Sequence, residues 1–241
     1  MTSTPELNSL KKQSRVAALL YFISCVPAPF ALLYVPNTLI VRGDAAATAN
    51  NVRDSEALLR LGMAVELFSC TIAIFAMLAF YRLFKAVSHK HALAFMILFL
   101  LSIPISYLNV LNNLAALTFA HGPAFLHAIF DKAQLDALVF FFLRLHSQGV
   151  ILAQIFWGLW LFPFGIVVLR SGFIPRWVGI AVMVAGGGYV ISSSVSLFLP
   201  ASAQGIGQLA MILGIGELAF FWMLIWGAKE PRPDLSRRLC G

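Results

Sequence analysis

Six long apolar stretches, separated by polar segments, set the pattern of this chain. They cover residues 16–41, 61–81, 92–120, 137–169, 177–199 and 206–228. Each is about 20 residues or longer, and a helix of that length crosses the ~30 Å hydrocarbon core of a bilayer. None alternates apolar and polar residues with a period of two, so the pattern predicts helices rather than the strands of a membrane barrel. The predicted fold is therefore all-α, an integral membrane bundle of six transmembrane helices.

Composition supports this prediction and assigns most of the chain to one domain. Of the 241 residues, 60% are hydrophobic and 11% are charged, whereas soluble domains carry roughly 25% charged residues. We expect a transmembrane domain over residues 15–228, an N-terminal tail over 1–14 and a basic tail over 229–241. The first apolar stretch continues without charge to Val41, longer than a signal peptide, so we expect it to be retained.

The net charge of +7 would also fit a nucleic-acid-binding protein. The positions of the basic residues along the chain therefore have to distinguish such a protein from a membrane protein. With the N-terminus inside, the inner segments hold twelve of the 17 Lys and Arg, the outer segments hold four, and Arg144 lies within a stretch. The inner residues are Lys11, Lys12, Arg15, Arg82, Lys85, Lys90, Arg170, Arg176, Lys229, Arg232, Arg237 and Arg238, and the outer ones are Arg42, Arg53, Arg60 and Lys132. The positive-inside rule therefore predicts that both termini are cytoplasmic. The expected partner is the lipid bilayer, and nucleic acid is not needed to explain the charge.

Two long connections, 42–56 and 121–136, fall on the outer side of this topology. In the first, Asp44 is expected to cap a short helix through Val52, and Asp54 to cap the second membrane helix. In the second, apolar residues recur at helical spacing opposite charged residues, which predicts one interfacial helix within 121–136. The apolar face consists of Phe125, Leu126, Ile129, Phe130 and Ala133, and the charged face of Asp131, Lys132 and Asp136. Such a helix is either a connector or a lid over an outward-facing pocket.

Prolines interrupt three of the apolar stretches. Pro27 and Pro29 lie in the first, Pro104 in the third and Pro163 in the fourth. Each removes a backbone donor, so we expect bent helices at these positions.

Ionisable residues inside the apolar stretches are few, and each costs about 2.5 to 3.5 kcal/mol at a helix centre. They are Glu66, Glu217, Arg144 and His146. The third stretch adds a polar stripe with Asn109, Asn112 and Asn113, and the fifth adds Tyr189 and Ser193. Counted from the outer helix ends, Glu66, Asn113, Arg144, His146 and Ser193 lie about 8 to 14 Å deep and Glu217 about 16 Å. The shared depth predicts a polar pocket in the outer half of the bilayer.

The same residues admit several roles. Arg144 can pair with either glutamate as a structural salt bridge, which leaves one acid over, and the asparagines can simply join helices by hydrogen bonds. Arg144 and His146 are two positions apart, so both cannot face one small pocket squarely. In an enzyme the catalytic candidates are Glu66, Glu217 and His146, and the ligand-binding candidates are Asn109, Asn112, Asn113, Arg144, Tyr189 and Ser193. His146 and the glutamates lack a short metal-ligand spacing, so we expect no metal site and no cofactor.

Five segments together resemble the bacterial membrane family called domain of unknown function 4386. They are Gly43–Ala49, Ser55–Gly62, Leu145–Gly149, Arg170–Arg176 and Gly216–Leu218, and the resemblance runs from about Arg15 to Gly227. It implies a multi-pass protein of the bacterial inner membrane with no established activity. The motif positions that it implies are Asp44, Glu56, Arg60, His146, Ser147, Arg170 and Glu217. The family often carries an Asp after its Gly-Tyr-hydrophobic-hydrophobic segment, where this chain has Ser192.

Three functions remain open at this point. The first is a membrane protein whose outward-facing polar pocket binds or transports a small or lipid-like molecule. The second is an integral-membrane enzyme that uses Glu66 and Glu217 as general acid or base on a lipophilic substrate, with a logic like that of small membrane terpene cyclases. The third is a structural or partner-binding bundle in which every polar residue is satisfied internally.

Overall fold

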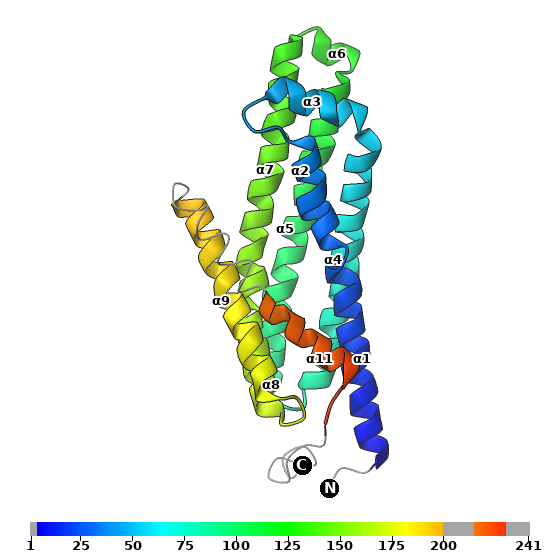
Figure 1. The fold of residues 1–241 in the computed structure, drawn as a ribbon, viewed down its shortest axis with the longest axis vertical. Coiled ribbons are helices and arrows are strands. Elements are labelled where there is room, and N and C mark those ends of the chain that lie inside the picture. The colour runs from blue at the N-terminus through cyan, green and yellow to red at the C-terminus, as the bar shows by residue number, and fades with distance from the viewer. Residues whose placement is uncertain (1–3, 200–214, 230–241) are drawn as a thin grey trace. The chain divides into compact units, whose positions relative to one another are not determined.

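Helices form all the regular secondary structure in residues 4–199 and 215–229, the part of the chain that the computed structural model describes. The elements are α1 (Thr4–Cys25), η1 (Phe30–Tyr34), α2 (Val35–Leu39), α3 (Ala45–Asp54), α4 (Glu56–Phe84), α5 (His89–His121), α6 (Ala124–His127), α7 (Lys132–Leu159), α8 (Leu161–Ser171), α9 (Arg176–Phe198), η3 (Ile215–Leu218) and α11 (Ala219–Ile225), as Figure 1 shows. The prediction of an all-α chain is thus confirmed for the described residues.

Five helical segments are long and apolar enough to cross a membrane. They are Leu7–Leu39, Glu56–Phe84, His89–His121, Lys132–Ser171 and Arg176–Phe198. They coincide with the first five predicted stretches, which supports a multi-pass membrane protein. The sixth stretch, 206–228, lies partly outside the described residues, and its described part forms η3 and α11.

The prolines divide two of these segments and leave a third intact. Helix α1 ends at Cys25, before Pro27, and the chain then forms the π-helix η1 directly after Pro29. Helix α7 ends at Leu159 because Pro163 has no N–H to donate to the Leu159 carbonyl. Pro104 lies inside α5 without ending it. The expected interruptions therefore occur in the first and fourth stretches.

The chain divides into two compact units, and α4, α5 and α7 each contribute residues to both. Unit 1 consists of residues 1–22, 72–103 and 151–241, and unit 2 of residues 23–71 and 104–150. Their charges differ within the described residues. Unit 1 holds Lys11, Lys12, Arg15, Arg82, Lys85, Lys90, Arg170, Arg176 and Lys229, with Glu6 and Glu217 as its acids. Unit 2 holds Arg42, Arg53, Arg60, Lys132 and Arg144, with Asp44, Asp54, Glu56, Glu66, Asp131 and Asp136 as its acids.

Aromatic rings and paired glycines form the interior of unit 1. The rings of Tyr21, Phe95, Phe99, Phe164 and Phe220 lie with their centroids 5.3 to 6.5 Å from that of Trp160.

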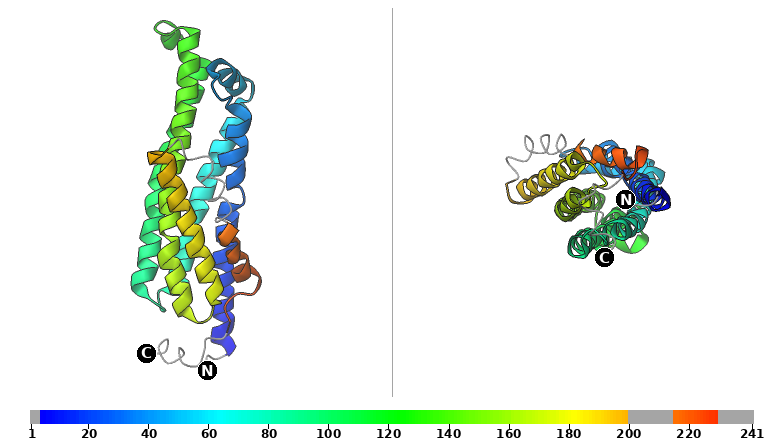
Figure 2. Two further views of the ribbon diagram at one scale, coloured as in Figure 1. Left: turned by 60° about the vertical axis from the view of Figure 1, so that its left-hand side comes forward. Right: turned by 90° about the horizontal axis from the view of Figure 1, so that it is seen from below.

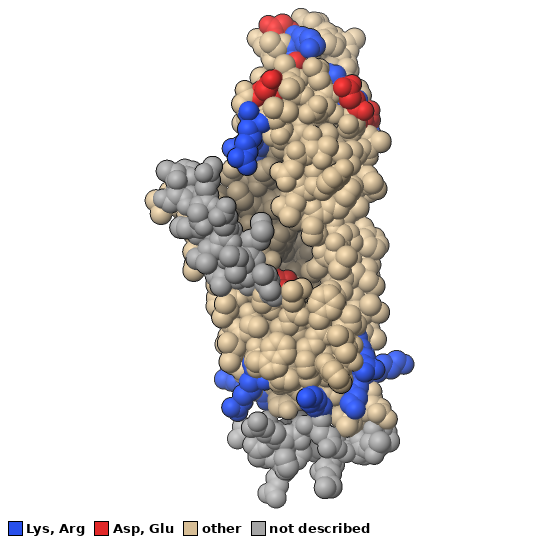
Figure 3. All heavy atoms as spheres, in the orientation of Figure 1, with Lys and Arg blue, Asp and Glu red and all other residues tan. Residues whose placement is uncertain are grey.

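Helices α8 and α9 of unit 1 are antiparallel neighbours joined by a short turn, and α11 lies beside α1 (Figures 1 and 2). On the face of the molecule that Figure 3 shows, basic side chains gather at the end of unit 1 where α1 begins.

The glycines of unit 1 let helix backbones touch. A Cβ on Gly165 would lie 2.7 Å from the Gly179 carbonyl oxygen, and one on Gly179 would lie 2.8 Å from that of Gly165. Gly158 and Gly186 repeat this reciprocal contact seven residues away, at 2.6 and 2.7 Å. Any side chain at these positions would push α9 away from α7 and α8.

Unit 2 has an aliphatic core contributed by α2, α3, α4, α5 and α7. Its buried members are Val35, Leu39, Ala49, Val52, Leu59, Met63, Val110, Ala116, Leu117, Ala120, Val139 and Leu143. Helix α3 runs crosswise to α2 and α7 in Figure 1. The prediction for Asp44 is confirmed, because its Oδ1 accepts a 2.8 Å hydrogen bond from the Ala47 N–H at the start of α3. The prediction for Asp54 is wrong, because Asp54 ends α3 and Ser55 precedes α4.

The single helix predicted within 121–136 is interrupted. Residues 124–127 form the one-turn helix α6, and α7 begins anew at Lys132. Asp131 Oδ1 accepts from the Gln134 N–H at 2.8 Å, and Gln134 Oε1 accepts from the Asp131 N–H at 3.0 Å. This reciprocal pair is a capping box, which begins a helix at Lys132 and separates it from the apolar residues upstream.

Candidate functional site

A buried carboxylate and a buried imidazole meet inside unit 2. His146 Nε2 on α7 lies 3.0 Å from Glu66 Oε2 on α4, and the two residues are only 5% and 8% exposed. Ionisable groups in a membrane-spanning helix are expensive unless they are paired, and each of these groups gives the other a partner. Glu66 Oε1 has no hydrogen bond among the described residues.

The asparagines of α5 lie next to this pair. Asn109 Nδ2 donates to the backbone carbonyl of His146 at 2.9 Å, and Asn112 Nδ2 donates to Asn109 Oδ1 at 2.9 Å. Helix α7 approaches α5 so closely here that a Cβ on Gly149 would collide with the Asn109 amide. Asn109 therefore fixes the part of α7 that carries His146.

Asn113 differs from its neighbours because its amide has no hydrogen-bond partner among the described residues. It is 6% exposed. Its amide atoms are not fully enclosed, because the enclosed side-chain atoms without a partner in the described residues are Ser14 Oγ and Ser69 Oγ. Asn113 lines a cavity, so the contents of that cavity are its available partner.

The cavity has a volume of about 20 Å³, room for one water molecule. Its walls come from η1, α2, α4, α5 and α7. Its apolar wall is formed by Ala31, Val35, Pro36, Leu39, Ile40, Leu59, Gly62 and Leu143, and its polar wall by Glu66, Asn113, His146 and Ser147. The Ser147 hydroxyl already donates to the Leu143 carbonyl at 3.1 Å. The π-helix η1 forms part of the wall, and such turns occur often at functional sites.

Arg144 does not form the salt bridge with a glutamate that the sequence suggested. Its side chain is exposed, and it forms no ion pair with a described residue. His146 takes the place beside Glu66, because residues two positions apart on a helix point to nearly opposite sides. Of the sequence-predicted residues, unit 2 thus brings together Glu66, His146, Asn109, Asn112 and Asn113, and leaves Arg144 outside the cavity.

The remaining predicted residues lie in unit 1. Glu217 Oε2 accepts a 2.5 Å hydrogen bond from the Tyr21 hydroxyl, and Tyr189 forms a second side-chain hydrogen bond with Glu217. Ser193 donates to Gln154 Oε1 at 3.4 Å. Sequence reasoning missed Tyr21 and Gln154. A signal existed for Tyr21, since a tyrosine in an apolar stretch usually needs a partner for its hydroxyl.

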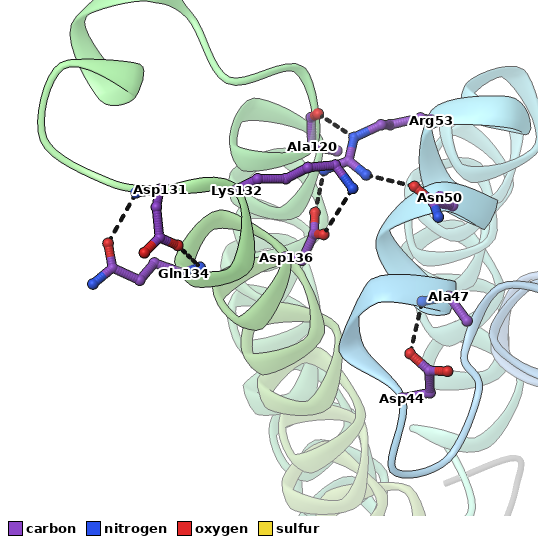
Figure 4. A network of polar contacts seen from close by, with 9 residues as sticks. All are labelled: Asp44, Ala47, Asn50, Arg53, Ala120, Asp131, Lys132, Gln134 and Asp136. Atoms are coloured by element: carbon purple, nitrogen blue, oxygen red, sulfur yellow. Dashed lines mark hydrogen bonds and ion pairs between the residues drawn. The ribbon is translucent and has the colours of Figure 1, made fainter.

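A second polar cluster that sequence reasoning missed joins α3, α5 and α7 in unit 2 (Figure 4). Arg53 forms an ion pair with Asp136, donates from Nε to the Ala120 carbonyl at 2.8 Å and donates from Nη1 to Asn50 Oδ1 at 2.9 Å. Lys132 Nζ lies 3.5 Å from Asp136 Oδ2. Asp136 is 3% exposed. The sequence predicts Asp136 on the charged face of an interfacial helix, but it lies in α7 and is buried, because Arg53 binds it from α3.

Within the described residues, no three His, Cys, Asp or Glu side chains lie close enough together to hold a metal ion. Glu66 and His146 form a pair without a third ligand of these types. The site therefore offers hydrogen bonds and one carboxylate–imidazole pair as its chemistry.

Comparison with known proteins identifies relatives without assigning a function. The family described as "Domain of unknown function (DUF4386)" matches residues 16–227. A segment of 79 residues is 35% identical to a protein of Archaeoglobus fulgidus described as "Uncharacterized protein" and covers 32% of this chain. It covers 46% of that relative, so the match spans about half of the relative's length. No solved structure matches the chain.

Proposed function

This chain belongs to the DUF4386 family, whose description assigns no activity, and from that premise we propose that it is a membrane protein that binds a small or lipid-like molecule in unit 2. The binding site is the cavity beside Glu66 and His146. Movement of the bound molecule through or within the membrane is the expected consequence of binding.

The unpaired Asn113 amide at the cavity is the observation that carries this proposal. Ser14 Oγ and Ser69 Oγ are also buried without a partner among the described residues, but neither serine lines the cavity. What sets Asn113 apart is therefore its place on the cavity wall. Here the neighbouring Asn109 and Asn112 are paired, whereas Asn113 and Glu66 Oε1 have no partner among the described residues. Both belong to residues that line the same cavity, so a ligand there could satisfy both groups.

The proposed topology has six spans, with both termini in the cytoplasm and the cavity in the outer half of the bilayer. The charge difference between the units supports it, because all nine described basic residues of unit 1 belong to the predicted inner set. The four predicted outer basic residues all belong to unit 2. For a bacterial chain the membrane is the inner membrane.

The segment 121–136 is proposed to lie at the outer membrane surface. Phe125 and Ile129 are 64% and 72% exposed, while Leu126 is buried. Exposed large apolar side chains at a helix end suit the boundary between lipid headgroups and acyl chains. We propose this segment as the lid, and its deletion over residues 124–133 should speed ligand exchange in the folded protein.

Copurified molecules test the proposed function. Wild type, His146→Gln and Thr118→Val are purified from the same membranes, and bound molecules are extracted and measured by mass spectrometry. Thr118 is the matched control, since its exposed hydroxyl donates only to the Leu114 carbonyl of its own helix. We expect a molecule that is retained by wild type and Thr118→Val and is depleted about tenfold in His146→Gln. Identical extracts from three well-folded proteins would contradict the proposal.

An acid–base enzyme is a second candidate, and Glu217 is the residue that favours it. Its carboxyl group is held by the hydroxyls of Tyr21 and Tyr189 and forms no ion pair with a described residue. In unit 1, Glu217 would act as general acid or base on a lipophilic substrate. Incubation with extracted lipids should then yield a product that disappears in Glu217→Gln while ligand binding persists. Turnover that survives both Glu217→Gln and Glu66→Gln would exclude this candidate.

A further inference from the structure

We infer that the unit 2 cavity recognises an uncharged hydroxyl group on a lipophilic molecule and rejects the phosphate or carboxylate of the same chain length. This inference names the ligand class of the proposed binding site and therefore rests on the proposed function. It follows from the charge of the cavity wall, from its free hydrogen-bonding groups and from its size.

The charge of the wall is unfavourable for an anion. Among the described residues, neither lysine nor arginine lines the cavity, and the ionisable side chains on its wall are Glu66 and His146. The imidazole Nε2 is already engaged with Glu66 Oε2 at 3.0 Å, and the nearby Arg144 side chain points to the exposed surface instead. A phosphate head would thus meet the Glu66 carboxylate without a cation to offset the repulsion.

The free polar groups match the hydrogen bonds of an alcohol. Glu66 Oε1 and Asn113 Oδ1 can accept, and Asn113 Nδ2 can donate. A hydroxyl group donates one hydrogen bond and accepts up to two. It can therefore donate to the Glu66 carboxylate while it accepts from the Asn113 amide.

The size of the cavity limits the polar head to about one oxygen atom. Its volume of about 20 Å³ holds one water-sized group, which is too little for a phosphate with four oxygens. The rest of the wall is apolar, and Ala31, Val35 and Leu39 contribute to it from η1 and α2. The cavity has no room for a hydrocarbon tail as well, so the tail would extend from it into the surrounding lipid.

Photolabelling can test the ligand class directly. The full chain is placed in phosphatidylcholine nanodiscs and labelled with a long-chain alcohol that carries a diazirine, and the labelled peptides are mapped by mass spectrometry. Three competitors of the same chain length are compared: 1-decanol, decyl phosphate and decanoate. We expect saturable labelling of peptides within 31–40, 59–66 and 143–147, with 1-decanol competing at least about tenfold better than decyl phosphate or decanoate.

Two variants and a control separate recognition from folding. Asn113→Leu should weaken competition by 1-decanol about tenfold, because the alcohol loses its donor. Glu66→Gln removes the negative charge with little change of shape, so competition by decyl phosphate should improve about threefold relative to 1-decanol but stay weaker, because the cavity is still too small for a phosphate. Thr118→Val should behave like wild type. Glu66→Gln that leaves the preference unchanged would overturn the charge argument.

The two proposals fail in different ways. If wild type shows no saturable labelling with any competitor, the proposed binding function is wrong. If labelling is saturable but decyl phosphate or decanoate competes as well as 1-decanol, binding stands and the inferred preference for an alcohol over an anion is overturned.

Discussion

Units 1 and 2 differ in the side chains that they bury. Unit 1 is filled by the rings around Trp160 and by glycine pairs that bring backbones into contact, whereas unit 2 buries Glu66, His146 and Asn113 around a cavity. Lipid tails are as apolar as leucine, so membrane helices associate through close packing or through polar contacts. Unit 1 shows the close packing, and unit 2 adds polar contacts to an aliphatic core. Under the proposed function, the polar interior of unit 2 serves binding and the close packing of unit 1 keeps the bundle rigid.

Two natural probes allow each unit to be followed separately. All five tryptophans, Trp157, Trp160, Trp177, Trp222 and Trp226, lie in unit 1. Cys25 and Cys70 lie in unit 2. Tryptophan fluorescence during unfolding in SDS therefore reports on unit 1. Cys240 belongs to unit 1, so it is replaced by serine in every variant, and thiol labelling of Cys25 and Cys70 then reports on unit 2.

The largest effect is expected from Gly165→Leu in unit 1. The added side chain would overlap the Gly179 carbonyl and force α8 and α9 apart, at a cost of about 3 kcal/mol of unfolding free energy. Tryptophan fluorescence would measure this loss. Gly187→Leu is the control, because a Cβ at Gly187 meets no atom within 4 Å. Equal losses for the two variants would contradict the role of backbone contact.

Arg53→Ala should break the polar cluster of unit 2. It removes a partner of the buried Asp136 and a donor to the Ala120 carbonyl, so we expect a loss of about 2 kcal/mol, measured by thiol labelling of unit 2. Arg60→Ala is the matched control, since its ion pair with Glu56 is much more exposed and should be worth less than about 1 kcal/mol. If both changes cost the same, the Arg53 cluster does not stabilise unit 2.

Tyr21→Phe tests a polar contact within unit 1. The ring packing on Phe220 and Trp160 is kept, but the hydrogen bond to Glu217 is lost, with an expected cost of about 1.5 kcal/mol by tryptophan fluorescence. Tyr81→Phe loses only a 3.3 Å contact with the exposed His89 and should cost less than about 0.5 kcal/mol. A negligible effect of Tyr21→Phe would mean that aromatic packing alone stabilises this part of unit 1.

Asn113→Leu should have the smallest effect on stability. Its amide has no partner to lose among the described residues, so the unfolding free energy of unit 2 should change by less than about 0.5 kcal/mol or rise. Asn109→Leu should cost about 1 to 2 kcal/mol, because it breaks two hydrogen bonds. Thiol labelling measures both variants. A large loss in Asn113→Leu would mean that the amide has a structural role, and would weaken the case for a ligand.

The sequence predicts the helical fold well because bilayer thickness requires long apolar segments, and caps such as Asp44 act within one turn. The interrupted helix at 121–136 shows where this reasoning fails. The apolar spacing from Phe125 to Ala133 is real, yet the Asp131–Gln134 capping box begins a new helix within it. The hydrophobic pattern and the cap give conflicting local predictions, and the helix boundary follows the cap.

The sequence also identifies most polar residues of the candidate site but not their partners. Glu66 and His146 are 80 residues apart, and Arg53 and Asp136 are 83 apart. Charge alone favours Arg144 as the partner of a glutamate. The choice of His146 depends on which face α7 turns toward α4, and this is decided by packing between distant segments.

The π-helix η1 makes unit 2 unusually tolerant of one kind of sequence change. Its backbone hydrogen bonds join residues five positions apart, whereas those of an α-helix join residues four positions apart. This turn therefore holds about one residue more than an α-helical turn. Deletion of one residue within Phe30–Tyr34 can convert it to an α-helix while α2 keeps its orientation. The same deletion in α4 before Glu66 would rotate the preceding residues by about 100° relative to the rest of the helix. Among homologous genes, length variation should therefore be found at η1 rather than in α4, and variants one codon shorter there would lose part of the cavity wall while keeping the bundle.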